Sequence, residues 1–222
     1  MNNIGNAANN PERQIGIRRA EEKDLPRVTS MFTTRLVDSV EQSYVLEGIQ
    51  AKEELMNLIL TIQNEDEYRV GEIWIAGDYQ GALTGHYGKG FSILSLLQRS
   101  IKTNKRLNKT MTKEDLNQLN ENLKRMEGTT DFRWRKKICG NNRYYYLQLV
   151  AIESSLKGSG IFRQLIEPIL MRSNHEKLPI LLDTHDENNV PIYEHFGFEL
   201  VEKHHAKSGA PIVQYSMIKR CE

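Results

Sequence analysis

Apolar and polar residues alternate along this chain in short blocks, some with strand-like and some with helix-like spacing. A period of two indicates a strand with one buried face, and apolar residues three and four apart indicate an amphipathic helix. In chain order these patterns predict strand 14–20, a helix from residue 24, helix 53–62, a hairpin of strands 68–76 and 81–87, two helices within 92–127, strand 143–152, helix 160–174, strand 179–184, helix 190–196, and strands 199–205 and 211–219. A strand–helix–strand unit near the C-terminal end requires a parallel pair within a mixed sheet. The sequence therefore predicts an α/β fold, or α+β in stricter usage.

Local signals sharpen two helix starts and one irregularity. Asp24 followed by Pro26 is typical of a helix start, with Asp as the cap and Pro in the first turn. Thr112, three residues before Asp115, predicts a second capped start. Pro168 lies inside helix 160–174, where the missing N–H predicts a kink or an early end.

The composition is that of an ordinary folded protein. The 222 residues suit one domain, 39% of them are hydrophobic, and no apolar run reaches the ~18 residues of a membrane span. We therefore predict a single domain over 14–220, no membrane partner, and a disordered, Asn-rich tail over 1–13 without the features of a secretory signal. Cys139 and Cys221 fit neither a disulfide framework nor a metal site, which favours a cytoplasmic location. The histidines lack metal-ligand spacing as well, so no metal is predicted.

Charge is distributed unevenly. Residues 86–143 contain 14 Lys or Arg against 5 Asp or Glu, while the whole chain has a net charge of only +1. Such a segment suggests an anionic partner, which leaves nucleic acid, an anionic substrate and the phosphates of a cofactor open, beside a plain solvated helix face. Only 132–137, Phe-Arg-Trp-Arg-Lys-Lys, mixes basic and aromatic residues as a nucleic-acid reader does, so nucleic acid is ranked last.

A glycine-containing turn carries the first chemical signal. Strand 143–152 leads through a short loop to Gly158-Ser159-Gly160, which opens helix 160–174. Glycines let a ligand approach the backbone closely, and free N–H groups at a helix start bind anions. Lys157 and Arg163 add positive charge on either side. The turn predicts a seat for phosphate or pyrophosphate, although a simple helix cap would have the same sequence.

A second element follows about 25 residues later, where strand 179–184 is succeeded by Asn-Asn-Val-Pro, Tyr193 and Gly197. Together with Val150-Ala151-Ile152 and the turn 157–162, this element resembles the GNAT superfamily of acetyl-CoA-dependent N-acetyltransferases. The resemblance spans residues 15–219 and treats 88–142 as an enlarged, basic helical insertion between the hairpin and strand four. It implies a mixed, mostly antiparallel sheet of six or seven strands flanked by helices.

Two positions depart from the family pattern. Lys157 stands where Gln or Arg is usual and keeps a positive charge. Phe162 stands where Gly or Ala is usual in the first turn of the helix. Its N–H can still face a phosphate, but its ring must find room elsewhere, and a poor fit would weaken binding or shift the helix.

The resemblance implies how acetyl-CoA would bind and react. Pantetheine would pair with the free edge of strand four at 149–152, a backbone N–H near Ile152 would polarise the thioester carbonyl, and Tyr193 would donate a proton to the departing thiolate. The implied cofactor-binding residues are Val150, Ala151, Ile152, Lys157, Gly158, Ser159, Gly160, Ile161, Phe162, Arg163 and Asn189.

The general base stays open. Family members place Glu or His at the strand-four positions that Gln148 and Tyr146 occupy here, and neither is an ordinary base at neutral pH. A water relay, a low-pKa amine, or Glu21, Glu22 or His86 are the alternatives. Candidate acceptor contacts are Tyr44, His86, Tyr146 and Gln148.

Two functions are therefore weighed. The first is transfer of an acetyl group from acetyl-CoA to a primary amine of a small molecule or peptide. The second is a CoA-binding module of the same fold without turnover, suggested by Phe162 and the missing strand-four base. The sequence is compatible with a monomer or a homodimer, and it specifies neither the acceptor nor the length of the acyl group.

Overall fold

The computed structural model describes residues 15–89, 93–131 and 133–221, so the predicted tail 1–13 lies outside the described residues. One mixed sheet runs through the molecule in the order β1-β2-β3-β4-β5-β7-β6. Its strands are β1 (Ile17–Arg19), β2 (Gly71–Ala76), β3 (Gly81–Lys89), β4 (Arg143–Ile152), β5 (Ile180–Thr184), β6 (Glu199–His205) and β7 (Val213–Lys219). Only β4 and β5 pair in parallel, and the other neighbours are antiparallel. The prediction of a mostly antiparallel mixed sheet is confirmed.

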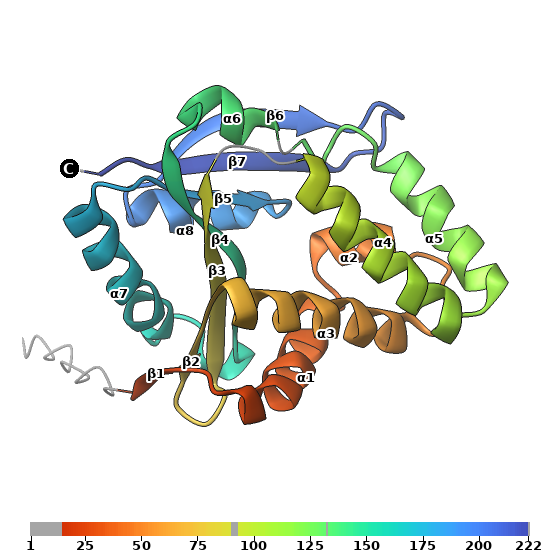
Figure 1. The fold of residues 1–222 in the computed structure, drawn as a ribbon, viewed down its shortest axis with the longest axis horizontal. Helices are drawn as coiled ribbons and strands as arrows, with labels where there is room; N and C mark the ends of the chain where they lie inside the picture. The colour runs from red at the N-terminus through yellow and green to blue at the C-terminus, as the bar shows by residue number, and fades with distance from the viewer. Residues whose placement is uncertain (1–14, 90–92, 132, 222) are drawn as a thin grey trace, which may run out of the picture.

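Helices cover both faces of this sheet (Figure 1). They are α1 (Leu25–Leu36), α2 (Val40–Val45), α3 (Lys52–Val70), α4 (Ile93–Thr110), α5 (Lys113–Arg125), α6 (Arg133–Cys139), α7 (Ile161–Glu176) and α8 (Val190–His195). On one face α1 and α3 bury an apolar cluster that includes Phe32 and Leu60. On the other face α7 buries Leu165 and Ile166 together with strand residues of β4, β5 and β7. The sheet is therefore the shared wall between two cores.

Several local predictions need correction. The segment 68–70 continues α3 and β2 begins at Gly71, while α2 and α6 were not expected. The short α2 was not predicted because six residues are too few to show the helical spacing of apolar positions. Helix α7 runs through Pro168 without a break. Its stripe of fully buried side chains, including Leu165, Ile166 and Ile169, stabilises it enough to offset one lost hydrogen bond.

The two predicted caps differ in outcome. The Thr112 hydroxyl accepts the N–H of Asp115 at 3.1 Å, so that cap is confirmed. Asp24 precedes α1, but its carboxylate makes no cap bond to that helix. It binds the N–H of Glu21 at 2.8 Å and the guanidinium of Arg18 instead. The two guanidinium hydrogen bonds hold the pKa of Asp24 well below its usual value.

The basic insertion packs onto the rest of the domain. Asn122 on α5 is buried and donates to the carbonyls of Val45 and Glu47, which ties α5 to the end of α2. On α6, Trp134 is 1% exposed and Arg135 is 9% exposed. Within the suggested reader segment 132–137, Trp134 and Arg135 are therefore turned inward, while Arg133 and Lys136 are exposed and Phe132 is outside the described residues. Across the described ranges, no helix is long and apolar enough to cross a membrane.

Candidate functional site

Strands β4 and β5 separate at the centre of the sheet. They pair only from Tyr145 with Ile180 to Leu147 with Leu182, although β4 continues to Ile152. Opposite, β3 pairs with β4 along its whole length, but the register moves from Gly85 with Leu147 to Thr84 with Leu149. Gln148 is therefore an extra residue, a β-bulge, and bulges bend a strand and twist it away from its neighbour. The bulge opens a gap between β4 and β5.

The bulge also decides which backbone groups face the gap. The N–H of Glu153 donates to the carbonyl of Gln80 at 2.8 Å. In an antiparallel ladder the bonds alternate, so the N–H groups of Leu149 and Ala151 face β3 as well. Those of Val150 and Ile152 therefore point into the gap, where no strand pairs with them. This edge can accept an extended ligand as an added strand would be accepted.

The glycine turn lies directly beyond this edge. Gly158 and Gly160 have φ angles of 79° and 83°, a region that favours glycine. The first intrahelical bond of α7 runs from the N–H of Gln164 to the carbonyl of Gly160, so the three preceding N–H groups have no intrahelical partner. They belong to Ile161, Phe162 and Arg163. With the positive end of the helix dipole they form a seat for an anion.

The bulky ring of Phe162 finds room against α8. It lies edge-on to Tyr193 and Phe196, with ring centroids 5.8 and 4.8 Å away. Arg163 reaches the same helix, with a guanidinium nitrogen 3.0 Å from Nε2 of His195. The Phe162 side chain, which stands where the family usually has Gly or Ala, thus connects the start of α7 to α8. The Phe162 backbone N–H takes no part in this ring packing.

The gap contains a cavity of about 420 Å³. Of the residues singled out from the sequence, Tyr146, Gln148, Val150, Asn189 and Tyr193 line it. Apolar side chains from α1, α2 and α3 form its other wall, among them Leu36, Val40, Met56, Ile59 and Leu60. Among the described residues no Lys or Arg lines the cavity.

Other candidates lie outside this lining. Tyr44 packs against the core beneath α1 and α3. His86 faces the buried Glu67, with Nδ1 3.0 Å from a carboxylate oxygen. Glu21 and Glu22 are exposed at the start of α1. Tyr44 and His86, which were expected as acceptor contacts, and Glu21 and Glu22, which with His86 were possible bases, do not line this cavity.

Tyr193 presents its phenol to the cavity from α8. Its ring packs against Phe162 and Phe198, at centroid distances of 5.8 Å each. Burial raises the pKa of Tyr193 to about 12, because an apolar surround disfavours the phenolate. The hydroxyl is therefore held in its protonated form, as a proton donor must be.

Asp183 is a cavity residue that the sequence did not reveal. Its Oδ1 accepts from Gln214 Nε2 at 2.7 Å and Ser216 Oγ at 2.6 Å. Its Oδ2 accepts from Tyr146 Oη at 2.9 Å and Arg135 Nη2 at 3.1 Å. Burial and this carboxylate raise the pKa of Tyr146 well above its ordinary value. With four donors the carboxylate is fully occupied, so it organises the cavity wall and does not serve as a base.

Replacing Asp183 by Asn should lower the free energy of unfolding by about 3 kcal/mol, because it leaves the buried Arg135 without its counter-charge. Chemical denaturation measures this change. The matched control is Asp78→Asn, whose carboxylate is 79% exposed beside Arg27 and should cost less than ~0.5 kcal/mol. Equal, small losses in both variants would contradict a structural role for the Asp183 network.

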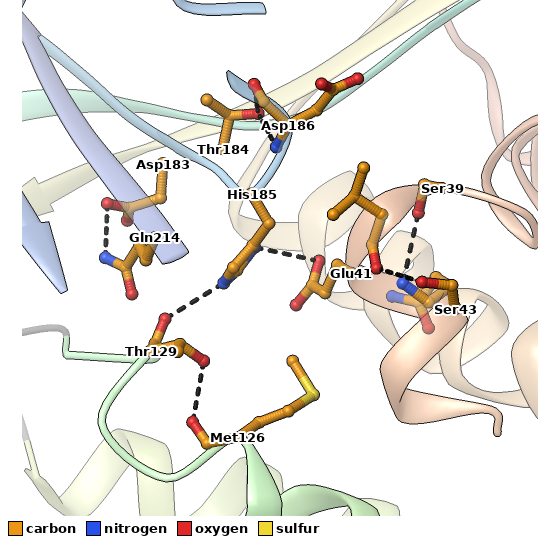
Figure 2. Close-up of polar contacts among 12 residues, drawn as sticks. Ser39, Glu41, Ser43, Met126, Thr129, Asp183, Thr184, His185, Asp186 and Gln214 are labelled. Carbon is orange, nitrogen blue, oxygen red and sulfur yellow. Dashed lines mark hydrogen bonds and ion pairs between the residues drawn. The ribbon is translucent and has the colours of Figure 1, made fainter. Parts of the chain in front are cut away.

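His185 and Glu41 form a second cavity feature that sequence reasoning missed (Figure 2). His185 follows β5, and its Nε2 lies 3.1 Å from the carbonyl oxygen of Thr129. Its Nδ1 lies 3.7 Å from Oε2 of Glu41 on α2. The His185 side chain is 8% exposed, while that of Glu41 is 40% exposed at the rim. Neither residue belongs to a local motif, and only the fold brings them together.

Comparison with known proteins gives one family and one fold. The family model described as the GNAT acetyltransferase domain matches residues 99–219. Over 54 residues the chain is 48% identical to an uncharacterized N-acetyltransferase of Schizosaccharomyces pombe, a match that spans 24% of this chain and 22% of the relative.

Solved structures cover nearly the whole chain. A Corynebacterium glutamicum structure, described as histone acetyltransferase HPA2 and related acetyltransferase, has a TM-score of 0.63 at 14% identity, over 94% of this chain and 97% of that one. Arylalkylamine N-acetyltransferase 2 of Aedes aegypti gives 0.61 at 14% identity, over 94% and 100%. Arabidopsis thaliana NAA60 in complex with acetyl-CoA gives 0.51 at 14% identity, over 93% and 98%. At these identities the likeness shows the fold.

Proposed function

The chain belongs to the GNAT acetyltransferase family, and from this premise we propose that it transfers the acetyl group of acetyl-CoA to a primary amine. One observation carries the proposal: the unpaired edge of β4 and Tyr193 border the same cavity, and the start of α7, with its free N–H groups, follows that edge in the chain and packs against Tyr193 through Phe162. The Arabidopsis relative was solved with acetyl-CoA, and the mosquito relative is named for arylalkylamine acetylation. Both names support the same chemistry here.

In this proposal the coenzyme lies along the gap. The pyrophosphate binds the N–H groups of residues 158 and 160–163, with Lys157 and Arg163 beside it, while the N–H of Ser159 donates to the carbonyl of Leu156 at 3.1 Å. Pantetheine lies along residues 149–152 and exchanges hydrogen bonds with Val150 and Ile152, whose backbone groups have no strand partner there. Asn189, which lines the cavity from the start of α8, contacts the coenzyme near the thioester.

The reaction needs two proton movements and one charge to be stabilised. Attack by the amine places negative charge on the thioester oxygen, and a backbone N–H of Val150 or Ile152 can stabilise it. The carbon–sulfur bond then breaks, and Tyr193 gives its proton to the leaving thiolate. The cavity beyond Gln148 and Tyr146 receives the acceptor.

The raised pKa of Tyr193 predicts that kcat does not change with pH in the alkaline range. A donor with a pKa of about 12 stays protonated where an ordinary phenol, with a pKa of ~10, begins to ionise. We therefore expect kcat at saturating amine to hold constant as the pH rises through ~10. Steady-state rates over this range check it. A decline centred on the ordinary tyrosine pKa would contradict the buried, neutral donor.

Two measurements on the full chain test the proposed function. Calorimetry measures binding of acetyl-CoA and CoA, and a thiol assay measures CoA release with a panel of primary amines. Binding together with amine-dependent release supports the transferase. Binding with no release from any amine would favour a CoA-binding module without turnover. No binding of either ligand would contradict both functions and would mean that the chain shares only the fold of the family.

A further inference from the structure

Three carboxylates line the cavity, and they differ in what they bind. Asp183 is occupied by four donors, as described above. Asp186 caps the turn before α8, because its Oδ1 accepts from the N–H and the side-chain amide of Asn188 at 3.0 and 2.9 Å. Glu41 makes no hydrogen bond to any described residue, and its Oε2 lies 3.7 Å from Nδ1 of His185. One carboxylate at the rim is therefore left for a ligand.

The hydrogen bond to Thr129 determines which nitrogen of His185 is basic. A carbonyl oxygen can only accept, so Nε2 carries the hydrogen that it donates at 3.1 Å. The neutral ring then presents an unprotonated Nδ1, and Figure 2 shows this side of the ring turned toward Glu41. The separation of 3.7 Å is too long for a hydrogen bond, so the Nδ1 lone pair is free to take a proton.

Several acidic groups share the cavity with this nitrogen. Among the described residues, the charged and titratable groups that line the cavity with His185 are Glu41 from α2, Tyr146 from β4, Tyr193 from α8, and Asp183 and Asp186 from its own segment, with Arg135 of α6 bound to Asp183. The charge of Glu41 reaches Tyr146 as well, where it helps to raise the pKa of that phenol. Asp183 is paired with Arg135 and Asp186 accepts from Asn188, so Glu41 is the carboxylate that lies beside Nδ1 without a hydrogen bond to a described residue.

The same lining describes the acceptor. Glu41 attracts a cation, and no Lys or Arg among the described lining residues attracts an anion. The wall from α1 to α3 is mainly apolar, with Ser39, Gln42 and Gln63 as its uncharged polar members. An ammonium group on an apolar body satisfies all three features. An amino acid would bring a second charge, its carboxylate, next to Glu41 or into the apolar wall, where an unpaired charge is costly.

On these grounds we propose that the acceptor is an apolar primary amine without a carboxylate, and that Nδ1 of His185, backed by Glu41, takes the proton from its ammonium group. This inference rests on the proposed acetyl transfer. The ammonium loses one proton to His185, the amine nitrogen bonds to the thioester carbon, and the carbon–sulfur bond breaks. Tyr193 gives its proton to the thiolate, the second proton lost by the nitrogen as the amide forms restores the Tyr193 phenol, and His185 releases its proton to solvent.

The first test compares isoamylamine with leucine, which is the same skeleton bearing an α-carboxylate, using the full chain and acetyl-CoA. Thiol release with isoamylamine is expected, with kcat/KM for leucine at least ~100-fold lower, since one unpaired buried charge accounts for that much. A higher kcat/KM for leucine would overturn the acceptor class while leaving the transferase in place. No release with any amine, despite bound acetyl-CoA, would remove the proposed function itself.

The second test concerns the base. His185→Gln should lower kcat/KM for isoamylamine by ~100-fold or more at neutral pH. Its rate should then follow the fraction of free amine, rising up to the amine's own pKa of ~10, whereas the unaltered protein levels off earlier. Glu41→Gln should raise KM for isoamylamine more than it lowers kcat, because the rim loses the charge that attracts the ammonium group. The matched control is His175→Gln, an exposed histidine on α7 outside the cavity, which should retain rate and profile.

Acetyl-CoA affinity, measured for each variant, shows whether the cavity is intact. A His185→Gln variant with normal affinity, an unchanged rate and an unchanged pH profile would overturn His185 as the base. If that variant no longer binds acetyl-CoA, the Glu41→Gln variant decides, and an unchanged kcat/KM for isoamylamine there overturns the pair.

Discussion

Removing the Tyr193 hydroxyl, by Tyr193→Phe, is expected to lower kcat by ~10²–10⁴-fold with little change in acetyl-CoA affinity. The ring still packs against Phe162 and Phe198, so the change deletes only the proton donor. The departing thiolate must then take its proton from water. Single-turnover rates with acetyl-CoA and an accepted amine measure the loss.

Tyr68→Phe is the matched control for this experiment. Tyr68 is 39% exposed on α3 and does not line the cavity, so its hydroxyl should be dispensable. A Tyr193→Phe variant that retains the full rate would show that another group, or solvent, protonates the thiolate. A parallel loss of acetyl-CoA affinity would point instead to a role for the phenol in binding.

Placing a carboxylate in the anion seat should abolish coenzyme binding. In Gly158→Glu/Gly160→Glu the two new charges would lie beside the N–H groups at the start of α7, and both positions have a positive φ that strains any side chain. We expect acetyl-CoA affinity to fall by at least ~10³-fold, since repulsion replaces several charge-assisted hydrogen bonds. Calorimetry gives the change directly.

Two controls separate the seat from general strain. Gly209 has a φ of 81° and open space around it, as Gly158 does, but it lies in the turn between β6 and β7. Gly209→Glu should therefore carry the same strain and bind acetyl-CoA normally, to be compared with the single Gly158→Glu variant. S-acetylpantetheine, which lacks the pyrophosphate, should lose little affinity in the double variant. Equal losses for both ligands would place the pyrophosphate elsewhere.

Some parts of the candidate site could be predicted from the sequence, because each lies within one short run of residues. The glycine turn, the strand before it and the start of α7 depend on neighbouring residues and on backbone φ, so a run of about twenty residues contains their whole explanation. The same holds for the Asn-Asn-Val-Pro segment and Tyr193 on α8. Regular periodicity likewise predicted the strands over 143–152 and 199–205 with the bounds that the structure has.

Tertiary structure alone decided the rest. The bulge at Gln148 appears only when β3 is paired with β4, and it turns Val150 and Ile152 toward the gap. In the sequence Asp183 looks like an ordinary strand residue, and only the structure shows that Arg135, Tyr146 and Gln214 donate hydrogen bonds to it. His185 and Glu41 come from a loop and a six-residue helix far apart in the chain, where no spacing marks either as chemical. Contacts between residues far apart in the chain determine where such side chains lie. Local sequence patterns do not show which distant residues will be in contact, so these cavity residues could be identified only in the folded protein.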